Sequence, residues 1–374
     1  MKKLFYYYSQ IIAEIFYIPK YIGYFFSRKK RAVYIGCIGK GNLGDEAVFS
    51  AIQSLLSKKI YLYSIAFNKP SSGKYLRKLF FHQPDLILLG GGTIIKKRKD
   101  ESYLRLFNKY HSKYPKAKLV VFGSGVGDPI LAEQVGFPTD VGAWKNILNK
   151  CCFIGVRGPI SQQILSNDWQ VKTKIQTLYD PAIFFKRQKL KPKQKQKKIG
   201  INFCNILGRI YGLNQADVEL FAKEIVQILI KKDWQVFLYP TANSDLDYMK
   251  SILGEDLISQ VRLYTNYKNI EDSLTFMEGM DVFIGQRLHS IIFAVITYTP
   301  FHAIEYESKT SDFLLSLGLE NYATRTDQLN AKPVIAIIEE QYQNIEKTQT
   351  ILFKCSNDAF VEQALTSKQL FLNL

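Results

Sequence analysis

Short, mostly apolar runs recur along the chain, and most of them end in glycine or in a polar cluster that precedes a helical apolar stripe. The runs cover residues 33–35, 60–66, 86–89, 118–122, 153–156, 199–203, 234–239, 261–264, 282–284 and 300–304. Runs of this length are typical of strands that are buried on both faces, as in a parallel sheet. The repeated order of strand, loop and helix predicts an α/β protein with two doubly wound, Rossmann-like domains facing each other across a cleft.

A lysine-rich, polar stretch separates the two sets of strands and is typical of an interdomain linker. The chain has 374 residues, which is enough for two domains of ordinary size. The pattern therefore predicts an N-terminal segment (1–31), a first Rossmann-like domain (32–185), a basic linker (186–198), a second Rossmann-like domain (199–330) and C-terminal helices (331–374).

The clearest candidate chemistry lies at residues 281–290. A short apolar strand ends at Gly285, and a helical stripe follows, with Arg287 and His289 expected in the first helical turn. Ligands bind at the carboxyl ends of parallel strands, and a helix N-terminus attracts anions. Arg287 suits phosphate or carboxylate, and His289 can exchange a proton near neutral pH. Alternatively, Arg287 pairs with a local carboxylate and His289 is a satisfied interior histidine.

A second candidate region, residues 36–46, connects the first strand to the first helix. Its glycines, Gly41 and Gly44 among them, allow a ligand to approach the backbone closely. The spacing matches neither the dinucleotide fingerprint nor the P-loop. Asp45 and Glu46 open the helix, where they either cap it, act as an acid or base, or bind sugar hydroxyls.

Two further glycine loops, at residues 90–92 and 123–127, also follow predicted strands. Arg157 ends another strand in the same half of the chain. Because the carboxyl ends of parallel strands meet at one edge of a sheet, these segments are expected to line one crevice. Arg157 is thus a second candidate for binding an anionic group, with a surface salt bridge as the alternative.

The formal net charge is +17, and three basic clusters at residues 28–31, 96–99 and 186–198 hold most of the excess. Clustered basic charge suits nucleic acid, anionic lipid or a phosphorylated substrate. No zinc-finger or RNP-like motif is present, which argues against nucleic acid. The five cysteines are scattered and favour free thiols in a reducing compartment. The four histidines lack metal-ligand spacing, so no metal site is predicted.

The N-terminal segment combines an apolar stripe at residues 4–16 with aromatic residues and the basic cluster at 28–31. It contains no apolar run of about 20 residues, the length that spans a bilayer, and no secretory cleavage site. An amphipathic aromatic segment followed by basic residues predicts peripheral contact with an anionic membrane. The alternatives are a helix packed on the protein's own surface and a helix that binds a partner.

Several short motifs follow one another between about residues 32 and 315. They are Gly41–Ala47, Gly90–Gly92, Gly123–Gly127, Val156–Arg157 with Ser161, Asp180–Ala182, Arg287–His289, and Tyr306 with Lys309. In this order, the motifs resemble the polysaccharide pyruvyl transferase family. Gly158, directly after Arg157, departs from the polar residue expected at that position. The N-terminal segment lies outside the resemblance.

The resemblance implies phosphoenolpyruvate as donor, a pair of sugar hydroxyls as acceptor, a GT-B-like fold and no cofactor. It implies a donor site formed by Arg157, Arg287, His289 and Lys309. His289 is the first candidate for the general acid, or for holding the departing phosphate, and Asp45 or Glu46 for the base. The acceptor loops are expected to include Gly41, Asn42, Gly44, Asp45, Gly91, Gly92 and Gly125.

Two other functions fit the same pattern. A nucleotide-sugar glycosyltransferase would share the fold, and a non-catalytic, membrane-associated protein of polysaccharide assembly would share the surface charge. The expected location is the cytoplasm, or the cytoplasmic face of the membrane, because phosphoenolpyruvate is available there and such acceptors are commonly lipid-linked. The sequence leaves the acceptor sugar, the hydroxyl pair, the ketal stereochemistry and the oligomeric state open.

Overall fold

The structure is a computed structural model. It describes residues 29–39, 41–64, 83–96, 103–192, 195–206 and 208–373, with a few single positions between 15 and 26. Most of the predicted membrane-contacting segment and residues 97–99 of the second basic cluster lie outside the described residues. No helix within the described ranges is long and apolar enough to cross a bilayer.

The first domain is built on a parallel sheet whose strand order is β2-β1-β3-β5-β6-β7, with β4 pairing beside the end of β5. The strands are β1 (Lys30–Ile35), β2 (Ile60–Ser64), β3 (Leu86–Gly90), β4 (Thr93–Ile95), β5 (Lys118–Val126), β6 (Cys151–Val156) and β7 (Ile175–Thr177). The central strands are buried on both faces, as their continuous apolar runs predict. The strand order reverses between β1 and β3, and the carboxyl ends of the strands at such a reversal are where doubly wound sheets bind ligands.

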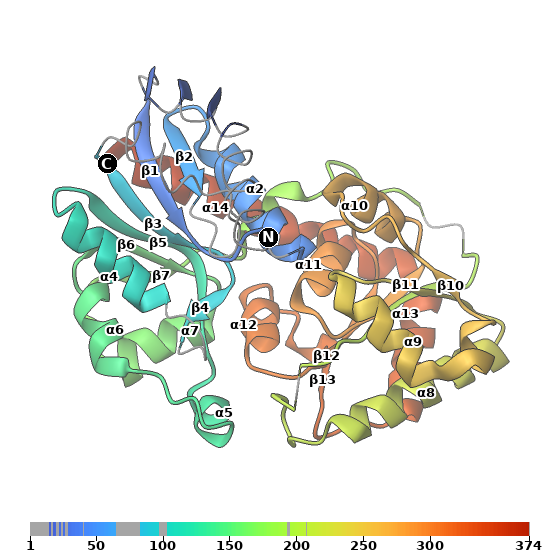
Figure 1. Ribbon diagram of the computed structural model, residues 1–374. Coiled ribbons are helices and arrows are strands. Elements are labelled where there is room, and N and C mark those ends of the chain that lie inside the picture. The colour runs from blue at the N-terminus through green and yellow to red at the C-terminus, as the bar shows by residue number, and fades with distance from the viewer. Residues whose placement is uncertain are drawn as a thin grey trace, which may run out of the picture.

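The second domain has its own parallel sheet, with the order β10-β9-β8-β11-β12-β13. Its strands are β8 (Lys198–Asn202), β9 (Gln235–Leu238), β10 (Arg262–Leu263), β11 (Val282–Gly285), β12 (Phe301–Glu305) and β13 (Ala323–Arg325). This is the Rossmann order, and its reversal point lies between β8 and β11. The chain therefore forms two doubly wound, Rossmann-like domains, as predicted, and Figure 1 shows them side by side.

Helices cover both sheets. In the first domain they are α2 (Leu43–Leu56), α4 (Tyr103–Lys113), α5 (Pro129–Gln134), α6 (Val141–Leu148), α7 (Pro159–Gln163), η1 (Ile164–Asp168) and η2 (Pro181–Phe185). In the second they are α8 (Gln215–Lys231), α9 (Asn243–Ile258), α10 (Ile270–Glu278), α11 (Leu288–Ile296), α12 (Lys309–Ser316), η3 (Glu320–Tyr322) and α13 (Ala331–Gln343). The last helix, α14 (Ile345–Asn373), returns from the second domain to the first (Figure 1).

One hydrophobic core joins the two domains. Every residue of α11 is buried. Leu288 and Ile292 of this helix belong to the same core cluster as Tyr34 and Leu43 of the first domain. The returning helix α14 adds to the junction, because the Gln363 side chain donates to the carbonyl oxygens of Leu178 and Asp180. The domains are therefore packed together, and the groups between them are held from both sides.

The prediction of a glycine loop at residues 123–127 is wrong, because β5 continues through Val126. The strand bulges at Gly123, which has φ 68°, and a Cβ there would come within 2.5 Å of Pro181. Beyond the bulge, the Gly125 amide donates to the Gly92 carbonyl at 2.9 Å. Pairing with the short strand β4 therefore continues the β5 ladder through the glycine run at 123–127, where the sequence predicts the strand to end.

Candidate functional site

The reversal points of the two sheets meet at one junction. The loop after β1 leads to the N-terminus of α2, and the loop after β11 leads to the N-terminus of α11. The Leu43 amide donates to the Thr241 carbonyl of the other domain at 2.9 Å. A Cβ added to Gly44 would lie 2.1 Å from the His289 ring. A glycine at position 44 is therefore required for the imidazole to pack against the first turn of α2.

His289 lies in the first turn of α11, as predicted, and is 8% exposed. Its Nε2 atom is buried without a hydrogen-bond partner among the described residues, and it lies 3.8 Å from Asp180 Oδ2. Burial lowers the pKa of His289 to about 4. The Asp180 carboxylate opposes this shift, whereas three neighbouring cations add to it: Arg157, Lys309 and Arg287. The imidazole is therefore neutral at pH 7.

Arg157 follows the last residue of β6, and its side chain is completely buried. Its Nε donates to Asp180 Oδ2 at 3.0 Å, and Nη1 donates to Thr93 Oγ1 at 3.1 Å. Within the described part of the chain, Nη2 is buried and has no partner. Gly125 makes room for this guanidinium, since a Cβ there would lie 3.1 Å from Nη1. The alternative for Arg157, a salt bridge at the surface, is therefore not what forms: Arg157 and Asp180 pair in the interior.

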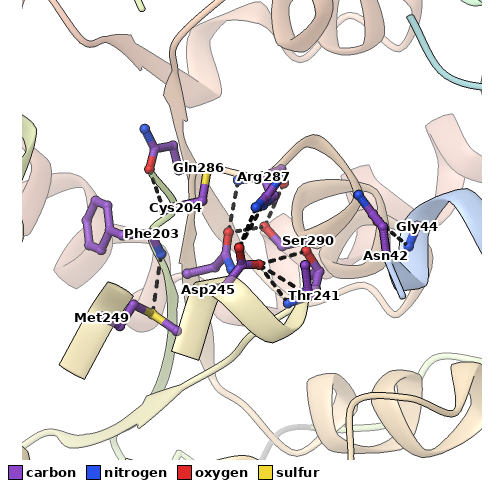
Figure 2. Close-up of polar contacts among 12 residues, drawn as sticks. Asn42, Gly44, Phe203, Cys204, Thr241, Asp245, Met249, Gln286, Arg287 and Ser290 are labelled. Carbon is purple, nitrogen blue, oxygen red and sulfur yellow. Dashed lines mark hydrogen bonds and ion pairs between the residues drawn. The ribbon is translucent and has the colours of Figure 1, made fainter. Parts of the chain in front are cut away.

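Arg287 is the N-cap residue of α11, one position before the helix in whose first turn it was predicted. Its amide donates to Asn202 Oδ1 at 2.9 Å, which joins the ends of β8 and β11. The guanidinium turns toward α9, where Nε and Nη2 donate to Asp245 Oδ1 at 3.0 and 2.5 Å (Figure 2). A local carboxylate for Arg287, the alternative raised by the sequence, is thus present.

Lys309 begins α12, and its ammonium lies 2.8 Å from Glu307 Oε1 and donates to the Tyr306 hydroxyl. Burial alone would lower the pKa of Lys309, but Glu307 and Tyr306 raise it above its ordinary value. The pKa of Glu307 is lowered to about 2, because the lysine cations outweigh the effect of burial. This pair is therefore charged at neutral pH.

Each cation of the predicted donor site lies beside a carboxylate: Arg157 beside Asp180, Arg287 beside Asp245, and Lys309 beside Glu307, which also pairs with Lys96 at 3.8 Å. Among the four side chains predicted for the donor site, two have a buried nitrogen without a hydrogen-bond partner in the described ranges. They are Arg157, at Nη2, and His289, at Nε2. Both side chains approach the same Asp180 oxygen, which Arg157 contacts through Nε at 3.0 Å and His289 through Nε2 at 3.8 Å. Buried polar atoms are normally hydrogen-bonded, so this arrangement is suited to an anionic ligand.

The glycine-rich region at the start of α2 positions two carboxylates. Asn42 caps the helix by accepting from the Gly44 amide, and Gly41 has φ 73°. Glu46 Oε1 accepts from the Gly39 amide at 2.6 Å and so secures the loop. Asp45 faces the β3 loop, since its Oδ1 would lie 3.7 Å from a Cβ on Gly92.

The loop after β3 needs glycine at two positions. Gly91 and Gly92 both have φ 71°, a conformation that other residues rarely adopt. A Cβ at Gly91 would also come within 2.2 Å of Val48 in α2. The loop therefore lies directly against the helix that carries Asp45.

Sequence reasoning missed the partners of the predicted cations. Asp180 was noticed only as part of a motif, and Thr93, Asp245 and Glu307 were not singled out. Asp245 sits in the first turn of α9, after a strand, which is the same local signal that identified Asp45. Gly158 is also explained, because a Cβ there would lie 2.0 Å from the Asp312 carbonyl oxygen. Among the described residues, no group of three His, Cys, Asp or Glu side chains could hold a metal ion.

The polysaccharide pyruvyl transferase family matches residues 42–308 of the chain. The matched region begins at the N-cap of α2 and ends just before α12, so it contains most of the junction. The chain is also similar to the amylovoran biosynthesis protein AmsJ of Erwinia amylovora, with 25% identity over 146 residues. That alignment covers 37% of this chain and 35% of AmsJ, so it spans about a third of the relative's length.

Solved structures with the same fold share little sequence with this chain. MnaA of S. aureus, solved with UDP, has a TM-score of 0.60 and 12% identity, covering 92% of this chain and 97% of that chain. Alr3699/HepE of Anabaena, solved with UDP-glucose, has a TM-score of 0.55 and 13% identity, covering 92% and 100%. These likenesses show the two-domain, GT-B-like fold.

Proposed function

The chain belongs to the polysaccharide pyruvyl transferase family, and from this premise we propose that it transfers the pyruvyl (carboxyethylidene) group of phosphoenolpyruvate to two hydroxyls of a saccharide. The product is a cyclic pyruvate ketal on a polysaccharide or on its precursor. The donor and the acceptor are the only co-reactants that this reaction needs.

The observation that carries this proposal is the pair of buried donors without acceptors, Arg157 Nη2 and His289 Nε2. Phosphoenolpyruvate carries a phosphate and a carboxylate, which suit a guanidinium fork and a helix N-terminus. His289 lies at the N-terminus of α11, and Lys309 at that of α12. The donor would bind where these groups converge, with Arg287 at the rim.

The reaction balances without a further reagent. Protonation of the donor's methylene carbon makes the adjacent carbon electrophilic, and the first hydroxyl adds to it and loses its proton. The bond from that carbon to the phosphate oxygen then breaks, and the second hydroxyl adds and closes the ring. Of the two hydroxyl protons, one is accounted for in the new methyl group and the other in the released hydrogen phosphate.

His289 is the proposed general acid, and the charge balance of the junction explains how it becomes charged. Without ligand its pKa is about 4, because it is buried near cations. A bound anion offsets the neighbouring cations and favours the imidazolium form of His289. Bound phosphoenolpyruvate therefore promotes protonation of His289, which then transfers this proton to the methylene carbon. Asp45 is the proposed base for the acceptor hydroxyl because it faces the β3 loop, and Glu46, which accepts from the Gly39 amide, is the second candidate.

A phosphate-release assay tests this function. The protein is incubated with phosphoenolpyruvate and a panel of model glycosides, including lipid-linked ones, and free phosphate is measured. Acceptor-dependent release, with a ketal methyl signal in the product, is the expected result. No release with any acceptor would contradict the proposal.

The second candidate function is nucleotide-sugar glycosyl transfer. It is favoured by one observation, since structures of similar fold were solved with UDP-glucose or UDP. The same panel with UDP-sugars in place of phosphoenolpyruvate separates the two, because glycosyl transfer would release UDP and no phosphate. Inactivity with both donors would favour a non-catalytic role in polysaccharide assembly.

Peripheral contact with anionic membrane is also part of the proposal. A described feature that supports it is the amino-terminal edge of the first sheet, opposite the junction. A cavity of about 330 Å³ at this edge is lined in part by Lys30, Lys116 and Lys118. Each basic residue near an anionic surface contributes about 1 kcal/mol. This basic edge continues the cluster that follows the aromatic N-terminal segment.

Vesicle co-sedimentation tests the membrane contact. The full chain is expected to bind phosphatidylserine vesicles at low salt and to dissociate as salt rises. A chain that begins at Lys29 keeps all of β1 and is expected to stay folded while binding much less. Equal binding of both chains would rule out the N-terminal segment as the anchor.

A further inference from the structure

Asp245 is the most highly connected carboxylate at the junction outside the predicted residues. It lies in the first turn of α9 and is 1% exposed. Its two oxygens serve different partners: Oδ1 accepts only from the Arg287 guanidinium, at 3.0 Å from Nε and 2.5 Å from Nη2. A carboxylate shared in this way fixes the plane of the arginine side chain as well as neutralising its charge.

The other oxygen is bound to the loop before α9. Asp245 Oδ2 accepts from the Thr241 amide at 3.0 Å, from the Thr241 hydroxyl at 3.2 Å and from the Ala242 amide at 3.1 Å. The same loop docks on the first domain, because the Thr241 carbonyl accepts from Leu43 and Ala242 pairs with Asn42. Figure 2 shows the contacts of Asp245 with Arg287 and Thr241, and Asn42 at the start of α2.

The guanidinium is held on one side only. Nε and Nη2 donate to Asp245, and Nη1 donates to no described residue. The Arg287 side chain is 20% exposed, in contrast to the buried carboxylate. The remaining N–H groups of Arg287 are therefore available to a ligand. The ion pair with Asp245 decides which way these N–H groups point.

We propose that Asp245 is the positioning residue of the donor site: it aligns Arg287 with the donor anion and ties that alignment to the loop that docks on the Asn42–Leu43 segment. This inference rests on the proposed function for the identity of the donor, but not for the contact itself. Asp245 acts through Arg287 and through Thr241, and it does not touch the donor.

Two opposing effects follow from removing its charge. An Asp245→Asn side chain leaves Arg287 poorly oriented, and a misplacement of about 1 Å costs on the order of 10²-fold in rate. At the same time, the loss of a negative charge beside the anion site favours binding of an anion. Turnover is therefore expected to fall while the affinity for phosphoenolpyruvate stays equal or increases.

The first experiment compares Asp245→Asn with Asp247→Asn, an exposed aspartate two positions along the same helix. We expect kcat to fall by about 10–100-fold for Asp245→Asn, with a Kd for phosphoenolpyruvate by calorimetry that is equal or lower. Asp247→Asn should match the wild type in both. The calorimetric titration also checks folding, because a partly unfolded sample would bind less than one phosphoenolpyruvate per chain. A stoichiometry close to one for Asp245→Asn would therefore assign the loss of kcat to misalignment of Arg287. Weaker donor binding with unchanged kcat would overturn the proposal.

The second experiment needs neither the donor nor activity. The ligand-free protein is treated with phenylglyoxal, and modification of Arg287 is followed by peptide mass spectrometry. Asp245→Asn should raise the modification rate of Arg287 several-fold and leave that of Arg262, an exposed arginine of β10, unchanged. An unchanged rate at Arg287 would overturn the proposal even if phosphoenolpyruvate proved to be the wrong donor. A faster rate in a protein that fails to bind phosphoenolpyruvate would retain the positioning contact and reject the donor.

Discussion

Each domain places an arginine–aspartate pair at the edge of its sheet, and the two pairs differ in burial. Arg157 and Asp180 are both 0% exposed, whereas Arg287 is 20% exposed beside a buried Asp245. Two fully buried charges depend on each other, because breaking such a pair leaves an isolated charge in the interior. A partly exposed guanidinium held by a buried carboxylate keeps its orientation and still presents its remaining N–H groups to a ligand. Similar chemistry therefore provides an enclosed pair in the first domain and a partly open, oriented pair in the second.

His289 lies between these two pairs and depends on both domains. It is carried by α11 of the second domain, packs on Gly44 of the first and lies 3.8 Å from Asp180. Neither domain alone surrounds the imidazole. The difference between the pairs thus has a functional meaning, because the enclosed pair holds the environment of His289 while the partly open pair presents an oriented guanidinium to phosphoenolpyruvate.

The largest expected effect is the loss of the proton carrier between the pairs. His289→Asn keeps hydrogen bonding but cannot transfer a proton near pH 7, so kcat should fall by about 10²–10⁴-fold. Steady-state kinetics with phosphoenolpyruvate and acceptor measure this, with circular dichroism to verify folding. If the affinity for phosphoenolpyruvate dropped while kcat stayed the same, His289 would be a binding residue. The proposal that it transfers a proton would then be wrong.

Gly44→Ala tests whether the domains must touch at His289. The added methyl would lie 2.1 Å from the imidazole, so the ring or α2 must shift, and kcat should fall by about 10²-fold. Gly142→Ala in α6 is the matched control, because the nearest atom to its Cβ is 3.8 Å away. Wild-type kinetics for Gly44→Ala would mean that the contact is incidental.

Matched lysine substitutions sharpen the contrast between the pairs. Arg287→Lys loses the bidentate contact and should reduce kcat/KM for phosphoenolpyruvate by about 10–100-fold, with little change in the unfolding midpoint. Arg157→Lys should also reduce kcat/KM, and unlike Arg287→Lys it should lower that midpoint by several degrees, because an ammonium cannot reproduce the buried bonds to Asp180 and Thr93. Thermal unfolding and donor kinetics on both variants measure the two effects. Equal stability losses would remove the distinction drawn here.

The smallest expected effect is in pH dependence. Burial lowers the pKa of both His289 and His302 to about 4. The unfolded chain, with histidine pKa values near about 6.5, then binds more protons than the folded chain below that pH. Stability is therefore complete above about pH 6.5 and declines as pH falls through pH 4, by about 1–3 kcal/mol for each histidine. Urea unfolding across this range measures the decline.

Donor binding should distinguish the two histidines. Phosphoenolpyruvate brings negative charge to His289 but not to His302, which bonds to Thr324 on β13. Calorimetry at pH 6 in buffers of different ionisation enthalpy should detect uptake of up to about one proton per donor. Uptake should vanish in His289→Asn and persist in His302→Asn. Equal uptake in both variants would assign the proton to another group.

Much of the fold is readable from local patterns. The apolar runs identify β1–β3, β5, β6 and β8–β12, because a strand buried on both faces is apolar along its length. The sequence pattern does not predict β4, β7 and β13, which are three residues long and each contain a polar residue. The same logic brought Arg157, Arg287 and His289 to the carboxyl edge of their sheets, where the structure has them.

What local patterns do not contain is which charges meet. Arg157 pairs with an aspartate 23 positions away, and Arg287 with one 42 positions away. Gly44 and His289 are in contact although they belong to different domains. Periodicity and turn chemistry act over a few residues and specify elements, whereas these contacts depend on how complete sheets and helices pack together. The amino-acid pattern alone thus accounts for the two sheets and their reactive edges, whereas tertiary packing decides the rest. Packing within each domain supplies the carboxylates that neutralise Arg157 and Arg287, and packing across the junction places His289 against Gly44.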